Sequence, residues 1–177
     1  MVMIFPERAP RLIVSDIDGT LLDRNHRVPK RNREAVSRAV AAGAEFALAT
    51  GRPFRWIMPV LEQLPVRPVC VTSNGAVIYD SAEDRVLSAH ELSPEALAET
   101  VNVATQVLQP LGGAGFGAER AGGSLLDPVE ELFVVESHYS ENALFEGFGL
   151  VSVGELVAKP AVKLLIRNTD YSAPELY

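Results

Sequence analysis

Three short apolar runs in the first half of the chain alternate with segments of helical periodicity, and this alternation constrains the fold more than any other feature. The runs cover residues 11–15, 45–49 and 69–72. Residues 31–42 repeat apolar side chains at helical spacing and are followed by Gly43, a common helix stop. Pro53, a residue favoured in the first turn of a helix, opens a second helical stretch that continues to about Leu61. Strand, helix, strand, helix, strand predicts an α/β fold with a Rossmann-like parallel sheet.

The pattern changes in the second half of the chain. Residues 76–79 and 85–88 flank the turn-forming segment 80–84 and predict a hairpin. Ser93 and Pro94 then form a typical helix start, and the helix should run to about Leu108. Short strand-like pieces follow at residues 132–135 and 162–166. We therefore predict an α/β unit over residues 1–90 and a smaller α+β unit over residues 91–177.

Composition narrows the class of protein. Of the 177 residues, 47% are hydrophobic and 22% are charged, which is the balance of a globular protein. The net charge of −7, with no run of Lys or Arg, argues against nucleic acid and anionic membranes as partners. A single cysteine, Cys70, excludes an intrachain disulfide. With no apolar stretch near the roughly 20 residues that span a bilayer and no signal peptide, we expect a cytoplasmic protein.

A pair of carboxylates follows the first predicted strand. Asp16 and Asp18 stand two residues apart in the segment Asp-Ile-Asp-Gly-Thr-Leu-Leu-Asp of residues 16–23. The carboxyl end of a strand is where open α/β sheets bind their ligands. There the first carboxylate can attack a substrate and the second can exchange a proton, while Gly19 allows a sharp exit from the strand. The alternative is an ordinary strand-ending turn, since Asp and Gly are common turn residues.

Polar turns also follow the next two predicted strands. Thr50, Gly51 and Arg52 precede the helical stretch at Pro53, and a hydroxyl with backbone N–H groups at a helix start can bind a phosphate-sized anion. The alternative there is plain helix capping by Thr50. The turn at residues 72–75 would by itself be no more than a turn. Because the carboxyl ends of successive parallel strands meet at one edge of a sheet, the three turns together predict one crevice.

The motifs DIDGTLLD, ATGRP and SNGA, in this order and spacing, resemble those of the haloacid dehalogenase superfamily. The resemblance is to its Cof-type phosphatases, which insert a large α+β cap into the core, and it covers essentially the whole chain. It implies a hydrolase for small phosphorylated metabolites such as sugar phosphates. Asp16 would be the nucleophile that takes the phosphoryl group as an aspartyl-phosphate, and Asp18 the general acid and base.

The resemblance also implies ligands for substrate and for Mg²⁺. Thr50 and the Gly51 N–H would hold phosphate oxygens, Arg52 would contact either substrate or solvent, and Asn74 would lie at the edge of the crevice. The Asp16 carboxylate and the Asp18 backbone carbonyl would bind Mg²⁺. A divalent cation is needed on physical grounds as well, because it cancels the repulsion between a carboxylate and a phosphate dianion.

Part of the family's pattern is missing. The family completes its site with a later Lys and a Gly-Asp-x-x-Asn-Asp motif, yet this sequence contains no Gly-Asp pair, and Lys159 and Lys163 are poor matches. We therefore expect a chain truncated at its C-terminus, with an incomplete cap at residues 91–177. Absent sheet neighbours would leave a bare strand edge through which the chain could self-associate.

Two other functions remain open at this stage. The chain could be a non-catalytic remnant that binds phosphate or a protein partner. Residues 113–118 also fit the glycine fingerprint of a nicotinamide-binding domain, but that fingerprint requires a strand before it and a helix after it, and here a predicted helix precedes it.

Overall fold

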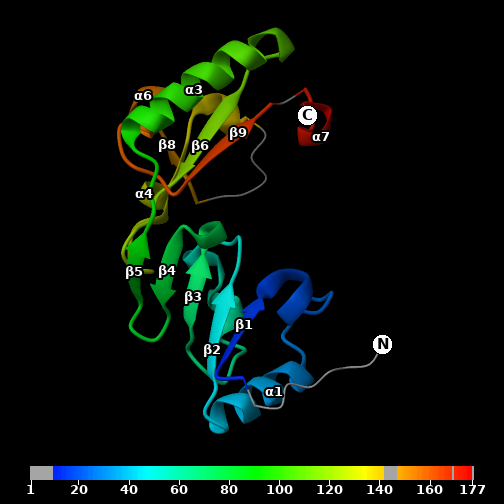
Figure 1. The fold of residues 1–177 in the computed structure, drawn as a ribbon. Coiled ribbons are helices and arrows are strands. Elements are labelled where there is room, and N and C mark those ends of the chain that lie inside the picture. The colour runs from blue at the N-terminus through cyan, green and yellow to red at the C-terminus, as the bar shows by residue number, and fades with distance from the viewer. Residues whose placement is uncertain (1–9, 142–146, 169, 177) are drawn as a thin grey trace. The chain divides into compact units, whose positions relative to one another are not determined.

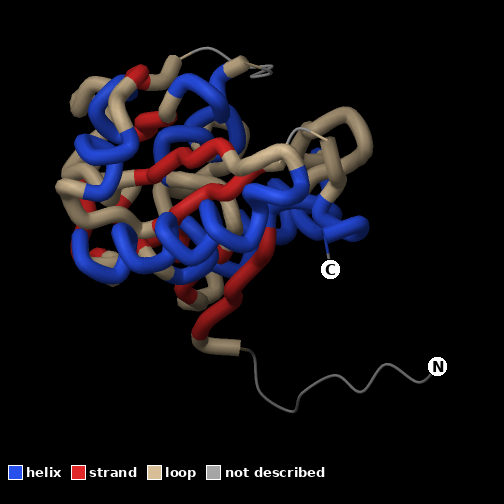
Figure 2. Tube along the Cα trace, turned by 90° about the horizontal axis from the view of Figure 1, so that it is seen from above, coloured by secondary structure: helices blue, strands red, loops and turns tan. Residues whose placement is uncertain are grey.

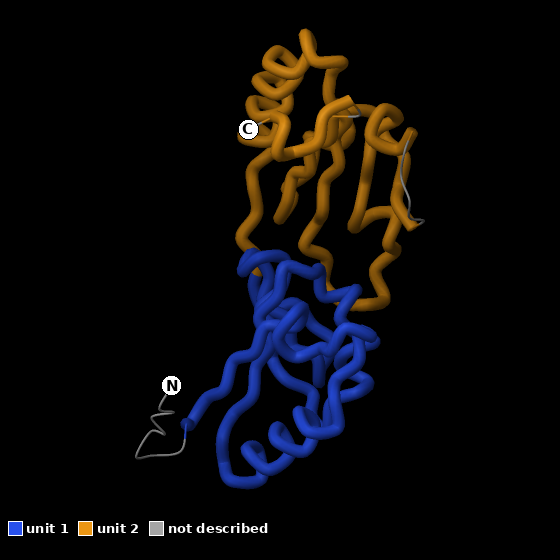
Figure 3. Tube along the Cα trace, turned by 90° about the vertical axis from the view of Figure 1, so that its right-hand side faces the viewer, with its two compact units in different colours: residues 1–88 blue, residues 89–177 orange. Residues whose placement is uncertain are grey.

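The computed structural model describes residues 10–141, 147–168 and 170–176. The chain divides into two compact units, residues 1–88 and residues 89–177 (Figure 3). The division lies close to residue 90, where the change of sequence pattern places a boundary. The interpretation of these units as part of a catalytic core and an incomplete cap remains a prediction.

The first unit is built on one five-stranded sheet (Figure 1). Its strands, in spatial as well as chain order, are β1 (Leu12–Asp16), β2 (Glu45–Ala49), β3 (Val69–Thr72), β4 (Val77–Asp80) and β5 (Arg85–Ala89). The pairs β1–β2 and β2–β3 are parallel, whereas β4 runs antiparallel to β3. Helix α1 (Lys30–Ala41) connects β1 to β2. The predicted α/β class with a parallel sheet is confirmed.

The register of the parallel strands aligns their carboxyl ends. Asp16, the last residue of β1, pairs with Ala49, the last residue of β2, and Ala49 pairs with Val71 near the end of β3. Each of these strands is followed by one of the polar turns identified in the sequence. The three turns therefore leave the sheet at the same edge.

The two faces of this sheet are covered unequally. The connections from β1 to β2 and from β2 to β3 step in the same direction, and right-handed crossovers of that kind lie on one face of a sheet. On that face Leu48 and Cys70 are fully buried. On the opposite face Leu12, Val14 and Val69 keep 54%, 53% and 41% of their surface exposed. Within the described residues, no strand pairs with the outer edge of β1 either.

The segment after Pro53 differs from the predicted helix. A 3-10 turn, Phe54–Trp56, is followed by a separate four-residue helix, α2 (Met58–Leu61). Pro59 explains the break, because it has no N–H to donate to a helix that would continue from the preceding turn. Phe54, Ile57, Val60 and Leu61 are nevertheless buried, whereas Trp56 keeps 52% of its surface exposed. The Phe54 ring stacks on Tyr79 of β4 with centroids 4.7 Å apart.

The second unit contains a four-stranded sheet in the order β8-β7-β6-β9. Its strands are β6 (Gly115–Glu119), β7 (Phe133–Val135), β8 (Gly149–Leu150) and β9 (Lys163–Arg167). Its helices are α3 (Pro94–Leu108), α4 (Val129–Leu132), α5 (Ser137–Ser140), α6 (Val153–Val157) and α7 (Ala173–Leu176). Strands are red and helices blue in Figure 2. In the part of the chain that the structure describes, no helix has the length and apolar character that crossing a membrane requires.

The second unit has its own apolar core. Leu97 and Val101 of α3 and Leu156 of α6 pack with Phe116 and Ala118 of β6. The Ser93 hydroxyl accepts the Ala96 N–H at the start of α3, as the sequence predicted. Helix α3 thus covers one face of the sheet through its buried side.

The glycine-rich segment at residues 113–118 leads into β6 and has a packing role. A Cβ atom on Gly115 would lie 2.5 Å from the backbone nitrogen of Tyr139, so only glycine lets α5 approach the strand this closely. The segment follows α3 and an adjoining 3-10 turn (Gln109–Leu111) and becomes a strand. The context that a dinucleotide fingerprint needs is therefore not found here.

The open edge and bare face of β1 generate a prediction about association. Parallel strands are normally buried on both faces, and apolar patches of more than a few hundred Å² drive association. We expect light scattering of the purified chain to give an average mass above that of the monomer. Val14→Lys should lower it, because a charge on the bare face opposes pairing. Val103 of α3 is equally exposed at 53%, and Val103→Lys is the control that should leave the mass unchanged. A wild-type chain that stays monomeric at high concentration would contradict this prediction.

Candidate active site

The turn after β1 presents two carboxylates outward. Residues Ile17–Leu21 form a wide turn closed by a 3.0 Å hydrogen bond from the Leu22 N–H to the Ile17 carbonyl. Ile17 and Leu21 are buried and anchor the turn, whereas Asp16 and Asp18 are exposed. Gly19 has a φ of 74°, a conformation that favours glycine and lets the chain leave the strand sharply. The sequence thus folds this turn by burying its apolar residues and exposing its carboxylates.

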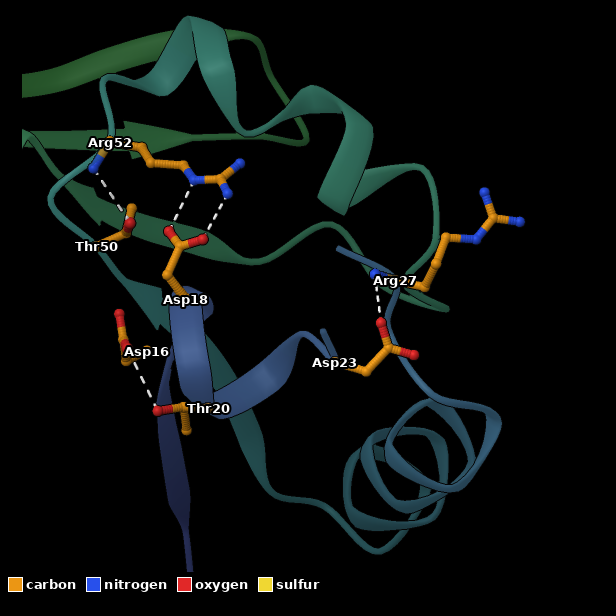
Figure 4. Close-up of polar contacts among 7 residues, drawn as sticks. All are labelled: Asp16, Asp18, Thr20, Asp23, Arg27, Thr50 and Arg52. Atoms are coloured by element: carbon orange, nitrogen blue, oxygen red, sulfur yellow. Dashed lines mark hydrogen bonds and ion pairs between the residues drawn. The ribbon is translucent and has the colours of Figure 1, made fainter. Parts of the chain in front are cut away.

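Asp16 is held within the turn by Thr20. The Thr20 hydroxyl lies 3.3 Å from Asp16 Oδ2 and donates a hydrogen bond to it (Figure 4). The contact leaves the exposed Asp16 carboxylate at the end of β1, facing the same edge of the sheet as the turns after β2 and β3.

Backbone hydrogen bonds join the turns that follow β2 and β3. The Asn74 N–H donates to the Thr50 carbonyl at 3.2 Å, and the Ser73 N–H donates to the Arg52 carbonyl at 2.9 Å. The Thr50 N–H in turn donates to Val71 of β3 at 2.9 Å. These backbone hydrogen bonds hold the two turns against each other without any contribution from side chains.

The side chains of Thr50 and Asn74 also contact neighbouring residues of these two turns. The buried Thr50 hydroxyl accepts the Arg52 N–H at 3.2 Å, and its own O–H can still donate. The Asn74 amide packs over Gly51, so that a Cβ at residue 51 would lie 3.3 Å from the amide nitrogen. The predicted anion site at a helix N-terminus is wrong in one respect, because a three-residue 3-10 turn, not a helix, follows Pro53.

Arg52 joins the turn after β2 to the turn after β1. Its Nε and Nη2 atoms lie 2.8 and 2.5 Å from Asp18 Oδ2 and Oδ1, a bidentate ion pair (Figure 4). The side chains of Arg52 and Asp18 are 27% and 50% exposed, so solvent screens the pair. The hydrogen bonds from Arg52 lower the pKa of Asp18 more than burial raises it, and the charges of Arg52 and then His26 lower it further.

The structure therefore brings all six predicted residues, Asp16, Asp18, Thr50, Gly51, Arg52 and Asn74, to one edge of the first sheet. It does not supply a larger set of metal ligands: within the described residues, no group of three or more His, Cys, Asp or Glu side chains could hold a metal ion. The family resemblance implied that Arg52 contacts either substrate or solvent, whereas the structure pairs it with Asp18. The position of Arg52 directly after Thr50 and Gly51, in the turn that follows the neighbouring strand, indicated that it lies near the site but not which residue it contacts.

The Arg52–Asp18 pair predicts a titration difference. In Arg52→Gln, the pKa of Asp18 should rise toward its ordinary value, because the neutral amide no longer stabilises the carboxylate. A carbon-detected NMR titration of the Asp side chains in metal-free buffer measures this directly. Arg27→Gln is the matched control, since the Arg27 side chain points away from Asp18 (Figure 4). An unchanged Asp18 titration in Arg52→Gln would show that the pair does not persist in solution.

Curated proteins with similar sequences are phosphatases. Phosphatase YwpJ from Bacillus subtilis (strain 168) is 39% identical over 70 residues, which are 40% of this chain and 25% of that protein. The 5-amino-6-(5-phospho-D-ribitylamino)uracil phosphatase YwtE from the same organism is 35% identical over 86 residues, 49% of this chain and 29% of that protein. The chain thus spans less than a third of the length of these two relatives.

Solved structures and a family model extend the likeness along the chain. The crystal structure of TM0651 from Thermotoga maritima matches with a TM-score of 0.64 at 21% identity, over 90% of this chain and 57% of that one, and so shares its fold. The model of haloacid dehalogenase-like hydrolases matches residues 13–111, more than half of the 177 residues. This match contains the turns that carry Asp16, Thr50 and Asn74. The chain belongs to the haloacid dehalogenase-like hydrolase family.

Proposed function

We propose that this chain carries the nucleophile part of a magnesium-dependent phosphatase that hydrolyses small phosphomonoesters, such as sugar phosphates, through an aspartyl-phosphate on Asp16. The observation that supports it most is the joining of Asp16 and Asp18, at the end of β1, with Thr50 and Asn74 at the ends of the neighbouring strands. Family membership and the phosphatases among the relatives support the same reaction class.

The reaction divides into two displacements at phosphorus. In the first, an Asp16 carboxylate oxygen bonds to phosphorus while the ester P–O bond breaks, and protonated Asp18 gives its proton to the leaving alcohol oxygen. In the second, the Asp18 carboxylate takes a proton from water, and the water oxygen attacks phosphorus. The Asp16–phosphate bond then breaks, which releases inorganic phosphate and restores the Asp16 carboxylate and the protonated Asp18.

Arg52 has a distinct role in this scheme. Its bidentate pair with Asp18 lowers the pKa of that carboxyl and so favours the base form, which the second displacement needs. The first displacement needs the acid form. We infer that Arg52 turns from Asp18 to the phosphate when substrate binds, which frees Asp18 to carry its proton. Thr50 and Gly51 are assigned to the other phosphate oxygens, and Asn74 to the edge of the crevice.

The donor atoms at the end of β1 fit a magnesium ion. Mg²⁺ commonly binds one or two carboxylates and completes its octahedron with water and substrate phosphate. The exposed Asp16 carboxylate and the Asp18 backbone carbonyl are oxygen donors of this kind. When bound, the ion offsets the negative charge of the carboxylate and the phosphate that approach each other. Because the described residues contain no group of three or more His, Cys, Asp or Glu side chains that could hold a metal ion, we expect weak binding in the absence of phosphate.

A second candidate is a non-catalytic module that binds phosphate or a protein partner. It is favoured by the donor set at the end of β1, since the described residues contain no group of three or more side chains that could hold a metal ion. For the phosphatase the expected ligand is a small phosphorylated metabolite; one relative is named for such a phosphate ester. We keep the cytoplasm as the expected location, on the sequence pattern alone, and expect no nucleic-acid partner, on the acidic composition. We expect the 177-residue chain itself to hydrolyse phosphate esters slowly, because the positive charge around the phosphate of a bound substrate is incomplete.

Two substitutions test the assignment of the carboxylates. Asp16→Asn should abolish Mg²⁺-dependent hydrolysis of a generic aryl phosphate, because an amide cannot form the acyl-phosphate. Asp18→Ala should lower the rate by about 10²- to 10⁴-fold through the loss of proton transfer. Glu34→Gln on the exposed face of α1 is the control and should be unchanged. Because turnover could be slow, single-turnover release of the aryl alcohol at high protein concentration is the suitable measurement.

The outcomes separate the two candidates. Substantial hydrolysis by Asp16→Asn would rule out this mechanism. A wild-type chain that binds phosphate but releases no aryl alcohol, even in a single turnover, would favour the binding module.

A further inference from the structure

A hollow beside Asp18 is lined by residues of the turn after β1 and of the loop that follows this turn. Asp18 and Gly19 form one side of it, and Leu22, Asp23, Arg24 and His26 form the rest. In the proposed reaction Asp18 protonates the leaving oxygen of the substrate. The part of the substrate beyond that oxygen therefore has this hollow next to it.

The loop at residues 23–27 is held in place from within. Asp23 Oδ1 accepts the Asn25 and Arg27 N–H groups at 2.8 and 3.0 Å (Figure 4 draws the second of these). The Asp23 N–H donates to the Arg27 carbonyl at 2.9 Å, and the His26 N–H donates to the Asp23 carbonyl at 3.0 Å. One carboxylate and the backbone together give the loop a defined shape.

The loop is also anchored at both ends. Leu22 is buried at its start, and Val28 is buried at its end. The Val28 N–H donates to the Gln63 side chain at 2.9 Å. The side chains of Arg24 and His26 are consequently presented from a fixed backbone beside Asp18.

Some of the charged side chains around the hollow have hydrogen-bond or ion-pair partners, and others do not. Asp18 is paired with Arg52, and Asp23 is engaged by two backbone N–H groups. By contrast, within the described residues the Arg24 guanidinium makes no hydrogen bond or ion pair. His26 lines the same hollow as Arg24 and Asp18. The hollow therefore offers the Arg24 guanidinium and the N–H donor of the His26 ring to whatever occupies it, despite the acidic charge of the chain as a whole.

We propose that Arg24 and His26 select substrates whose leaving group carries a second anion, a carboxylate or another phosphate, at a distance that reaches the hollow. This inference rests on the proposed function, because it takes the orientation of the substrate from the roles of Asp16 and Asp18. It assigns specificity to the loop after the nucleophile, in addition to any contribution of the second unit.

Two probes of matched size test the inference by binding alone. Glycerol 3-phosphate and 3-phosphoglycerate share a three-carbon skeleton and a phosphate, but only the second carries a carboxylate. Calorimetric titration of the 177-residue chain with each, in the presence of Mg²⁺, should give about 3- to 10-fold tighter binding of 3-phosphoglycerate, the effect of one or two exposed ion pairs.

Substitutions in the loop test which side chains cause the preference for 3-phosphoglycerate. Arg24→Gln and His26→Gln should each reduce the preference for 3-phosphoglycerate and leave the affinity for glycerol 3-phosphate unchanged. Arg27→Gln, on the same loop but outside the hollow, should keep the preference. Equal wild-type affinities, or a preference that survives both Arg24→Gln and His26→Gln, would overturn this inference and leave the phosphatase proposal standing. If neither probe binds, both proposals are overturned.

Discussion

The parallel pairing of β1 with β2 and of β2 with β3 is the constraint on which the rest of the site depends. Because Asp16, Ala49 and Val71 stand in register, the turns after all three strands leave the sheet at one edge. The backbone bonds from Asn74 to Thr50 and from Ser73 to Arg52 then hold two of these turns together. A shift of register by one residue would turn the side chain of Asp16 to the other face of the sheet. The chemistry of the site is thus set by backbone pairing first.

The ion pair between Arg52 and Asp18 is the main electrostatic interaction between the turns that these paired strands align. It couples the turns after β1 and β2 and biases Asp18 toward its charged form. Exposure limits its contribution to stability, so its significance lies in the protonation state that it selects. A cation that can exchange a carboxylate for a phosphate suits the role proposed for Asp18, which is to act first as an acid and then as a base.

Much of this arrangement could be predicted from the sequence, because the informative residues are local. The runs at 45–49 and 69–72 are apolar and end in polar turns, and the structure has strands over the same residues. The helix expected from Pro53 was wrong, since Pro59 interrupts the backbone hydrogen bonds although the apolar spacing persists. The Arg52–Asp18 pair could not be foreseen, because it depends on side-chain conformations of residues 34 positions apart. The roles of the six site residues remain predictions, as does the self-association through β1.

The central claim is that Asp16 becomes covalently phosphorylated, and reductive trapping tests it most directly. An acyl-phosphate is reduced by borohydride to the alcohol, so a phosphorylated aspartate becomes homoserine, which peptide mass mapping locates. After incubation of the chain with an aryl phosphate and Mg²⁺, we predict homoserine at residue 16 and none in Asp16→Asn. Homoserine at another aspartate, or its absence under conditions in which phosphate is released, would contradict this account.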